Sequence, residues 1–162
     1  MSDDPAVDFA VLAYREEGRW ELVSLPPRHV PDLDTLVSLM RQQPAEGGTL
    51  ALVSVEEDYF VVARSRGPAV SLLLSDVTAA DESPFARAVL DHLDLPLPDD
   101  EDLDQVQPAG ELDLLADLGV PAMDLAALCS ELDLYPDEAL AEIAGRLGFG
   151  AQFEAAVDSA GR

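Results

Sequence analysis

The sequence predicts an α+β protein with a five-stranded antiparallel sheet, flanking helices and a C-terminal bundle of short helices. Two observations predict this class. Apolar runs of strand length, joined by short turns, fill much of the first 75 residues, whereas apolar residues beyond residue 110 recur at helical spacing. The chain has 162 residues, 48% of them hydrophobic. A chain of this length can bury about 70% of its unfolded surface, enough for a substantial core.

The first two strands are expected to form a hairpin. Residues 8–14 are a near-continuous apolar run, which is typical of a central strand covered on both faces. Residues 15–18 read as a turn, and residues 20–25 then alternate between two faces. Two prolines at 26 and 27 end the second strand, because proline cannot donate to the hydrogen-bond ladder.

A helix is predicted at residues 31–43, where Leu33, Leu36, Val37 and Met40 form one apolar stripe. Three strands follow at 49–55, 59–64 and 69–75, and the short loops between them require antiparallel neighbours. A second helix runs from Ser83-Pro84 to about Leu93, with serine as its cap. This element order resembles longin, roadblock and profilin-like domains, which mostly serve as binding platforms.

Residues 95–110 are expected to form an acidic, proline-rich linker. The linker divides the chain into a sheet domain, residues 1–94, and a helical domain, residues 111–162. Helices are predicted at 111–118, 121–132, 136–147 and about 151–157. The third of these has the clearest start, with Pro136 in the first position and two acids in the first turn.

Charge is the most unusual feature of the composition. The chain has 33 acidic and 9 basic residues, all nine of them arginine, and a net charge of −24. Residues 1–90 hold 15 acids and seven arginines (−8), while residues 91–162 hold 18 acids and two arginines (−16). Such a balance excludes nucleic acid binding through a general basic surface and favours a basic protein as partner.

The single cysteine, Cys129, excludes a disulfide framework and any multi-cysteine zinc site. The acidic N-terminal residues lack the apolar run of a signal peptide, and no apolar stretch approaches the ~20 residues of a membrane span. We therefore expect a cytoplasmic protein without a membrane contact. The sequence leaves its oligomeric state open.

No residue pattern indicates catalysis or a cofactor. His29 and His92 are isolated, and Cys129 lies on an apolar helix stripe among acids, without a histidine partner. The zinc deaminase signature, H-x-E followed by P-C-x-x-C, is absent. We expect no enzyme activity, no cofactor and no catalytic residue.

One acidic segment comes near to a metal motif. Four of its acids, Asp100, Asp102, Asp104 and Glu111, occupy positions 1, 3, 5 and 12 of a calcium loop. However, Gln105 replaces the glycine of position 6, Pro108 stands at position 9, and the preceding Leu-Pro-Leu-Pro cannot be a helix. We therefore expect no metal site.

Four segments together resemble one protein family over nearly the whole chain. They are residues 9–20 (FAVLAYREEGRW), 41–48 (RQQPAEGG), 72–80 (LLLSDVTAA) and 132–149 (LDLYPDEALAEIAGRLGF). The chain is identified by them as similar to the tRNA adenosine deaminase-associated proteins of high-GC bacteria. Members are named for genes beside a tRNA adenosine deaminase gene, so the resemblance implies a shared pathway, the editing of tRNA wobble adenosine to inosine. The resemblance supplies no catalytic residues.

These observations favour a non-catalytic accessory protein that binds a basic partner, such as a tRNA adenosine deaminase. The candidate partner-binding residues are the acids of the linker and of one helix start, namely Asp99, Asp100, Glu101, Asp102, Asp104, Asp137 and Glu138. A plain solubilising spacer is the alternative for the linker. Three other functions stay open: a nucleic acid mimic that inhibits a nucleic-acid-binding protein, an unrecognised small enzyme, and a homo-oligomeric platform.

Overall fold

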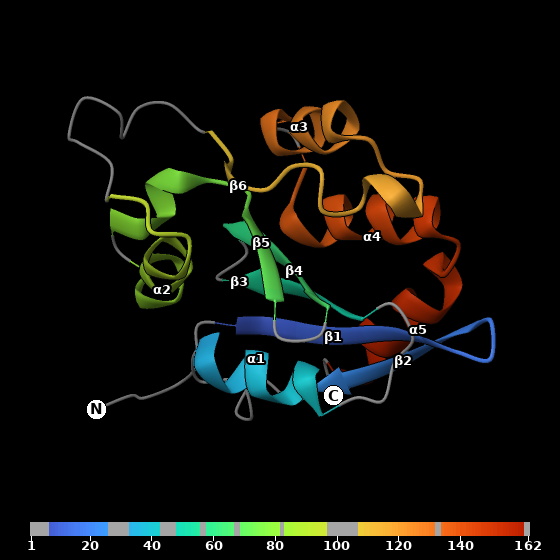
Figure 1. The fold of residues 1–162 in the computed structure, drawn as a ribbon. Helices are drawn as coiled ribbons and strands as arrows, with labels where there is room; N and C mark the ends of the chain where they lie inside the picture. The colour runs from blue at the N-terminus through green and yellow to red at the C-terminus, as the bar shows by residue number, and fades with distance from the viewer. Residues whose placement is uncertain are drawn as a thin grey trace.

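A six-stranded antiparallel sheet forms the middle layer of the protein (Figure 1). The computed structural model describes residues 7–25, 33–42, 48–55, 58–66, 69–81, 83–96, 107–131 and 134–160. The strand order is β2-β1-β3-β4-β5-β6. The strands are β1 (Val7–Glu16), β2 (Arg19–Leu25), β3 (Thr49–Val55), β4 (Tyr59–Arg66), β5 (Ala69–Leu74) and β6 (Ala109–Gly110).

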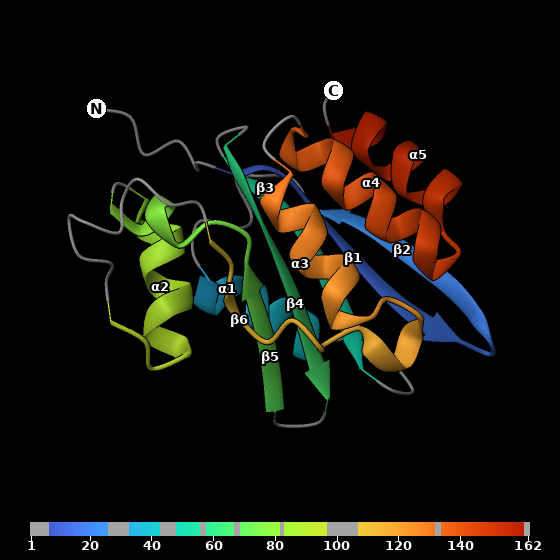
Figure 2. The ribbon, with the colours of Figure 1, turned by 90° about the horizontal axis from the view of Figure 1, so that it is seen from above.

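Helices cover both faces of this sheet (Figure 2). They are α1 (Leu33–Arg41), α2 (Pro84–His92), α3 (Ala122–Ser130), α4 (Pro136–Leu147) and α5 (Gly150–Ala160). The predicted α+β class is confirmed, and so is the expectation that the first strand is a central one. Each central strand alternates its side chains between two cores, which explains why its sequence is apolar throughout.

The first core lies between one sheet face and α1 and α2. Leu12, Val53 and Leu72 project from the strands onto this face and are fully buried. The apolar stripe of α1, predicted from its spacing, packs against them. Tyr59 joins this core and shares a buried hydrogen bond of 2.6 Å with the hydroxyl of Ser83, the residue that caps α2.

The second core lies between the opposite sheet face and the C-terminal helices. Val11, Leu52 and Val62 point to this face, and Leu140 and Ile143 of α4 pack on them. Two aromatic pairs join the sheet to the helical layer. Phe153 of α5 meets Phe9 edge-on, with ring centroids 5.9 Å apart, and Phe149 packs on Trp20 with ring centroids 4.8 Å apart. The C-terminal helices therefore rest on the sheet. The division into domains 1–94 and 111–162 stays a prediction.

Two elements differ from the sequence-based expectation, and both lie near the predicted linker. The sheet has six strands, not five, because residues 109–110 of that segment pair with Leu73 and Leu74 as β6. Two residues are too few to give a recognisable strand pattern. Residues 97–106 lie outside the described part of the chain.

The second difference lies at residues 111–118, where a helix was expected. The chain forms turns there instead, with a short 3₁₀ helix at Ala116–Leu118. Leu114 and Leu115 are both buried, so this segment inserts two consecutive side chains into the second core. The carbonyl of Leu114 accepts a hydrogen bond of 2.9 Å from the side chain of Arg64, where a helix would use its own backbone donors.

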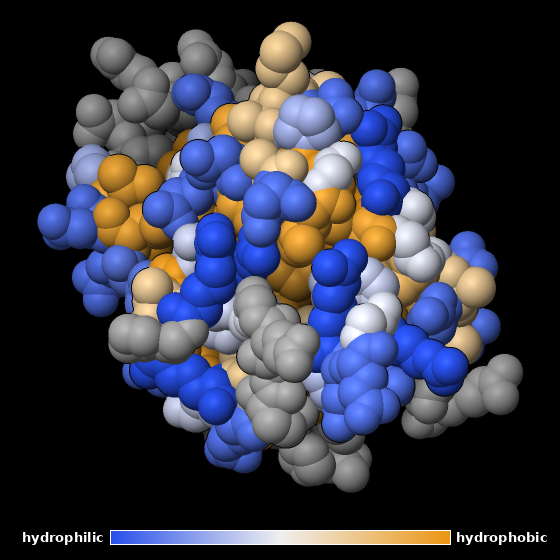
Figure 3. Space-filling model, turned by 45° about the vertical axis from the view of Figure 1, so that its right-hand side comes forward, coloured by the Kyte–Doolittle hydropathy of each residue, from blue (hydrophilic) through white to orange (hydrophobic). Residues whose placement is uncertain are grey.

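On the face seen in Figure 3, hydrophobic side chains show in gaps between charged and polar ones. Among the described residues, the large hydrophobic side chains that stand exposed are Val23, Leu95, Met123 and Tyr135. No helix in the described ranges is long and apolar enough to cross a membrane.

Candidate functional site

Strand register gathers acids at one end of the sheet. Val7 pairs with Val55, and Val55 pairs with Tyr59, so the start of β1, the end of β3 and the start of β4 lie together. Asp8 and Asp58 stand at these strand ends, and Asp76 follows the end of β5 beside them. Antiparallel pairing thus brings three distant parts of the sequence to the same end of the sheet.

The helical layer adds two more acids to the same place. Glu131 follows α3, and Asp137 lies in the first turn of α4. Together with the three acids from the sheet they line two hollows, and residues at the start of α4 contribute to both. We call this region the acidic end and define it by Asp8, Asp58, Asp76, Glu131 and Asp137.

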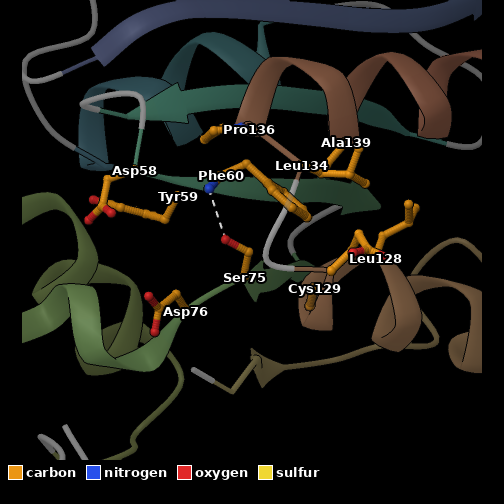
Figure 4. Close-up of a pocket in the computed structure, with 11 residues that line it drawn as sticks. Asp58, Tyr59, Phe60, Ser75, Asp76, Leu128, Cys129, Leu134, Pro136 and Ala139 are labelled. Atoms are coloured by element: carbon orange, nitrogen blue, oxygen red, sulfur yellow. Dashed lines mark hydrogen bonds between the residues drawn. The ribbon is translucent and has the colours of Figure 1, made fainter. Parts of the chain in front are cut away.

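The first hollow has a volume of about 200 Å³ and is drawn in Figure 4. The carboxylates of Asp58 and Asp76 lie along one side of it, while Leu128, Leu134 and Ala139 form the opposite side. Its floor includes Phe60, whose backbone N–H donates to the hydroxyl of Ser75 at 2.9 Å. An apolar wall facing a carboxylate rim suits a side chain with an aliphatic stem and a cationic tip.

The second hollow has a volume of about 380 Å³ and also includes residues at the start of α4. Asp8, Asp137 and the exposed Tyr135 line it, above the apolar side chains of Phe9 and Val157. The hydroxyl of Ser54 donates to Asp8 Oδ2 at 2.8 Å, which orients that carboxylate. Among the described residues that line the two hollows there is no arginine and no histidine.

Arginines gather at the opposite end of the sheet. Arg15 and Arg19 flank the β1–β2 turn, and Arg64 and Arg66 lie at the end of β4. Trp20 pairs with Arg15, whose guanidinium lies 4.8 Å from the centre of its ring. The sheet is therefore acidic at one end and rich in arginine at the other.

Arg64 has a structural role at that end. Its side chain is only 5% exposed and donates to the carbonyl of Leu114 and to both carboxylate oxygens of Asp117. The hydrogen bond from Arg64 holds the pKa of Asp117 below its usual value. This ion pair fixes residues 114–117 against the sheet.

The structure places the predicted binding residues as follows. Asp99, Asp100, Glu101, Asp102 and Asp104 lie outside the described ranges. Asp137 lines the second hollow. Glu138 accepts a hydrogen bond of 3.1 Å from the backbone N–H of Tyr135, so it caps α4.

Four acids of the acidic end, Asp8, Asp58, Asp76 and Glu131, were missed by the sequence-based reasoning. A signal was available for three of them, because Asp8, Asp58 and Asp76 stand at ends of predicted strands that alternate in direction. Tyr135 was also missed, although its position directly before Pro136, at the start of a predicted helix, was a signal in the sequence.

The groups considered for catalysis stay apart. His92 lies at the exposed end of α2, and His29 is outside the described residues. Cys129 is 6% exposed on the wall of the first hollow, and burial raises its thiol pKa to about 12, which disfavours a thiolate nucleophile.

Within the described ranges, no three histidine, cysteine or acidic side chains converge as metal ligands. Most of the calcium-like segment, residues 100–106, is not described.

Comparison with known proteins gives one consistent result. The model of a family described as "Rv3753c-like tRNA adenosine deaminase-associated protein" matches residues 8–150. The protein named Rv3753c of Mycobacterium tuberculosis is 38% identical over 164 residues, which cover 98% of this chain and 94% of that protein. No solved structure matches the chain.

Proposed function

The chain belongs to the Rv3753c-like tRNA adenosine deaminase-associated protein family, and from this premise we propose that it is a non-catalytic accessory protein that binds a tRNA adenosine deaminase directly. The acidic end is the contact surface in this proposal. The protein works in the cytoplasm and makes no contact of its own with tRNA.

Charge complementarity supports this function. An enzyme that acts on tRNA needs a basic surface to neutralise phosphates. Five carboxylates from five separate parts of the chain surround the two hollows of the acidic end, and the described residues that line these hollows include no basic side chain. Such a surface would steer a basic partner into place, and the apolar walls would add contact area. This convergence of acids around apolar hollows is the observation that carries the proposal.

Affinity measured by isothermal titration calorimetry tests the proposal. The probe is the purified tRNA adenosine deaminase of the same organism, titrated with the full chain at low salt. The acidic-end variant carries Asp58→Asn, Glu131→Gln and Asp137→Asn, three exposed positions. We expect its affinity to fall by about tenfold or more, because close charge pairs across an interface couple strongly.

A matched control removes three exposed charges elsewhere. Glu16→Gln and Glu21→Gln lie at the arginine-rich end, and Asp91→Asn lies on α2. This variant should bind within about twofold of the natural protein, because scattered charges away from the contact change long-range attraction only. Equal losses in both variants, or no complex with the natural protein, would contradict the proposal.

The same titration addresses the nucleic acid mimic. If tRNA competes with the chain for the deaminase, the acidic end occupies the phosphate-binding surface itself. If a ternary complex forms, the chain binds a basic surface beside the tRNA site. Both results are consistent with direct binding to the deaminase, but only competition with tRNA supports the nucleic acid mimic.

A further inference from the structure

The second hollow combines features that fit one particular side chain. Its lining holds two carboxylates from separate elements, Asp8 of β1 and Asp137 of α4, and one exposed aromatic ring, Tyr135. Tyr135 is 65% exposed, so its ring is accessible to a partner. We infer that this hollow is the receptor for one arginine side chain of the partner protein.

The local structure fixes the two parts of the lining that come from the helical layer. Pro136 begins α4, and the carboxylate of Glu138 accepts the N–H of Tyr135, so the backbone that carries Tyr135 and Asp137 is held in place. On the sheet side, the hydroxyl of Ser54 holds the carboxylate of Asp8. A receptor whose groups are oriented before binding loses less entropy when it is filled.

Arginine fits these groups better than lysine. A guanidinium is planar, so it can stack on the ring of Tyr135 while its separate N–H groups donate to the carboxylates that line the same hollow. Its aliphatic stem would cover Phe9 and Val157, which form the apolar part of the lining. The volume of about 380 Å³ lies at the lower end of the roughly 300–1,000 Å³ of small-molecule sites, a size that suits one long side chain.

This inference rests on the proposed function for the identity of the partner, and it makes the start of α4 the anchor of the contact. Charges around the rim mainly set the rate and selectivity of association. A buried arginine between carboxylates and an aromatic ring is instead the kind of contact that dominates binding energy.

A titration of the full chain with acetyl-arginine amide, followed by amide NMR shifts, tests the hollow alone. We expect saturable shifts confined to the amides of Phe9, Tyr135, Asp137 and Val157. Acetyl-citrulline amide, which has nearly the same shape without the charge, should give none. The lysine probe, acetylated on its α-nitrogen so that the side-chain ammonium is kept, should bind at least about threefold more weakly. An ammonium cannot stack on the ring and bridge the carboxylates at the same time. Equal binding of the lysine probe overturns the arginine assignment, and so do shifts scattered over the acidic surface.

Variants locate the binding. Tyr135→Ala and Asp137→Asn should each weaken the arginine probe by about fivefold or more, while Tyr135→Phe, which keeps the ring, should stay within about twofold. Met123→Ala removes another exposed apolar side chain and Asp91→Asn removes an exposed charge on α2, so both serve as controls. Unchanged binding in Tyr135→Ala and Asp137→Asn overturns the receptor.

The deaminase titration separates this inference from the proposed function. If the natural chain binds the enzyme and Tyr135→Ala binds it equally well, the receptor is wrong and the proposed function stands. If no complex forms with the enzyme while the arginine probe still fills the hollow, the proposed function fails and the receptor stands.

Discussion

Arg64 is a cation placed inside the second core, and the carboxylate of Asp117 neutralises it. Its guanidinium binds both the backbone of Leu114 and the side chain of Asp117, so it joins the sheet to the segment that follows β6. A buried cation without its counter-charge is costly. The contact therefore stabilises the attachment of the helical layer.

Replacing Asp117 by asparagine should lower the free energy of unfolding at pH 7 by about 1–2 kcal/mol. The loss is smaller than for a fully buried pair because Asp117 is 53% exposed. The pKa of Asp117 is lowered in the folded state from 3.8, so its contribution is complete above that value and disappears as the pH falls below it.

Urea unfolding of both proteins at pH 7 and pH 3 measures this contribution. The difference between natural protein and variant should shrink at the lower pH. Asp113→Asn, at an exposed position, should stay within about 0.5 kcal/mol of the natural protein at both values and is the control. A difference that does not depend on pH would contradict the ionic role of Asp117.

Burial has the opposite effect on the thiol of Cys129, because it disfavours the charged thiolate and raises the pKa. Because its pKa is raised to about 12 and its side chain is only 6% exposed, Cys129 presents very little thiolate to a reagent at pH 8. We expect labelling by iodoacetamide to be at least about a hundredfold slower in the native protein than in guanidinium chloride. Rapid native labelling, measured by mass spectrometry, would show that the first hollow opens to the thiol.

Elements with a start signal and a stop signal were predicted from the sequence with little error. Helix α4 has its predicted bounds, because Pro136 and two acids begin it and Gly148, with a φ of +97°, ends it. Strand β3 also has its predicted bounds. By contrast, β6 and the turn at 111–118 depend on contacts with Leu72 and Arg64, which lie more than 35 positions away in the sequence.

The residues of the candidate site also divide into those with a local sequence signal and those whose placement depends on long-range contacts. Asp137 could be predicted because its helix start is a local signal. Asp8, Asp58 and Asp76 stand at the ends of predicted strands, but the order of the strands in the sheet, which brings these ends together, is set by long-range pairing. The charge excess was evident from composition, whereas its arrangement around two hollows depends on the fold.

The glycine of β6 provides a test at the level of one element. Gly110 has a φ of +113°, and a Cβ there would lie 2.2 Å from the carbonyl oxygen of Leu72. Gly110→Ala should destabilise the protein by about 1–3 kcal/mol through backbone strain and the lost pairing of β6. Gly145→Ala is the matched control, because a Cβ on this residue of α4 meets nothing within 4 Å.

The control should be neutral or stabilise the protein by up to about 1 kcal/mol, since alanine favours the helix. Thermal unfolding of both variants measures the contrast. Equal effects of the two substitutions would mean that β6 is not a fixed part of the sheet.

At the scale of the molecule, the two cores share one sheet, so we expect the chain to unfold in one transition. Leu140 is fully buried in the second core, and Leu140→Ala should cost about 2–5 kcal/mol. Trp20 fluorescence reports the contact between sheet and helical layer, because this ring packs on Phe149. Its unfolding midpoint should coincide with that of circular dichroism in the natural protein and should shift equally in the variant.

Two separate transitions would instead support the division into domains 1–94 and 111–162. Met123→Ala, at an exposed position of α3, is the control and should change stability by less than about 0.5 kcal/mol.

The charge distribution of the whole molecule supports the proposal that the acidic end is the surface that meets the deaminase. Hydrogen exchange of the natural chain, alone and with saturating deaminase, is the sharpest test of this proposal, because each amide reports its own protection. Binding should slow exchange at residues that line the two hollows, such as Phe9, Ser54, Tyr59, Cys129 and Asp137, and should leave β2 and the β1–β2 turn unchanged. Protection confined to the arginine-rich end, or none under saturation, would contradict it.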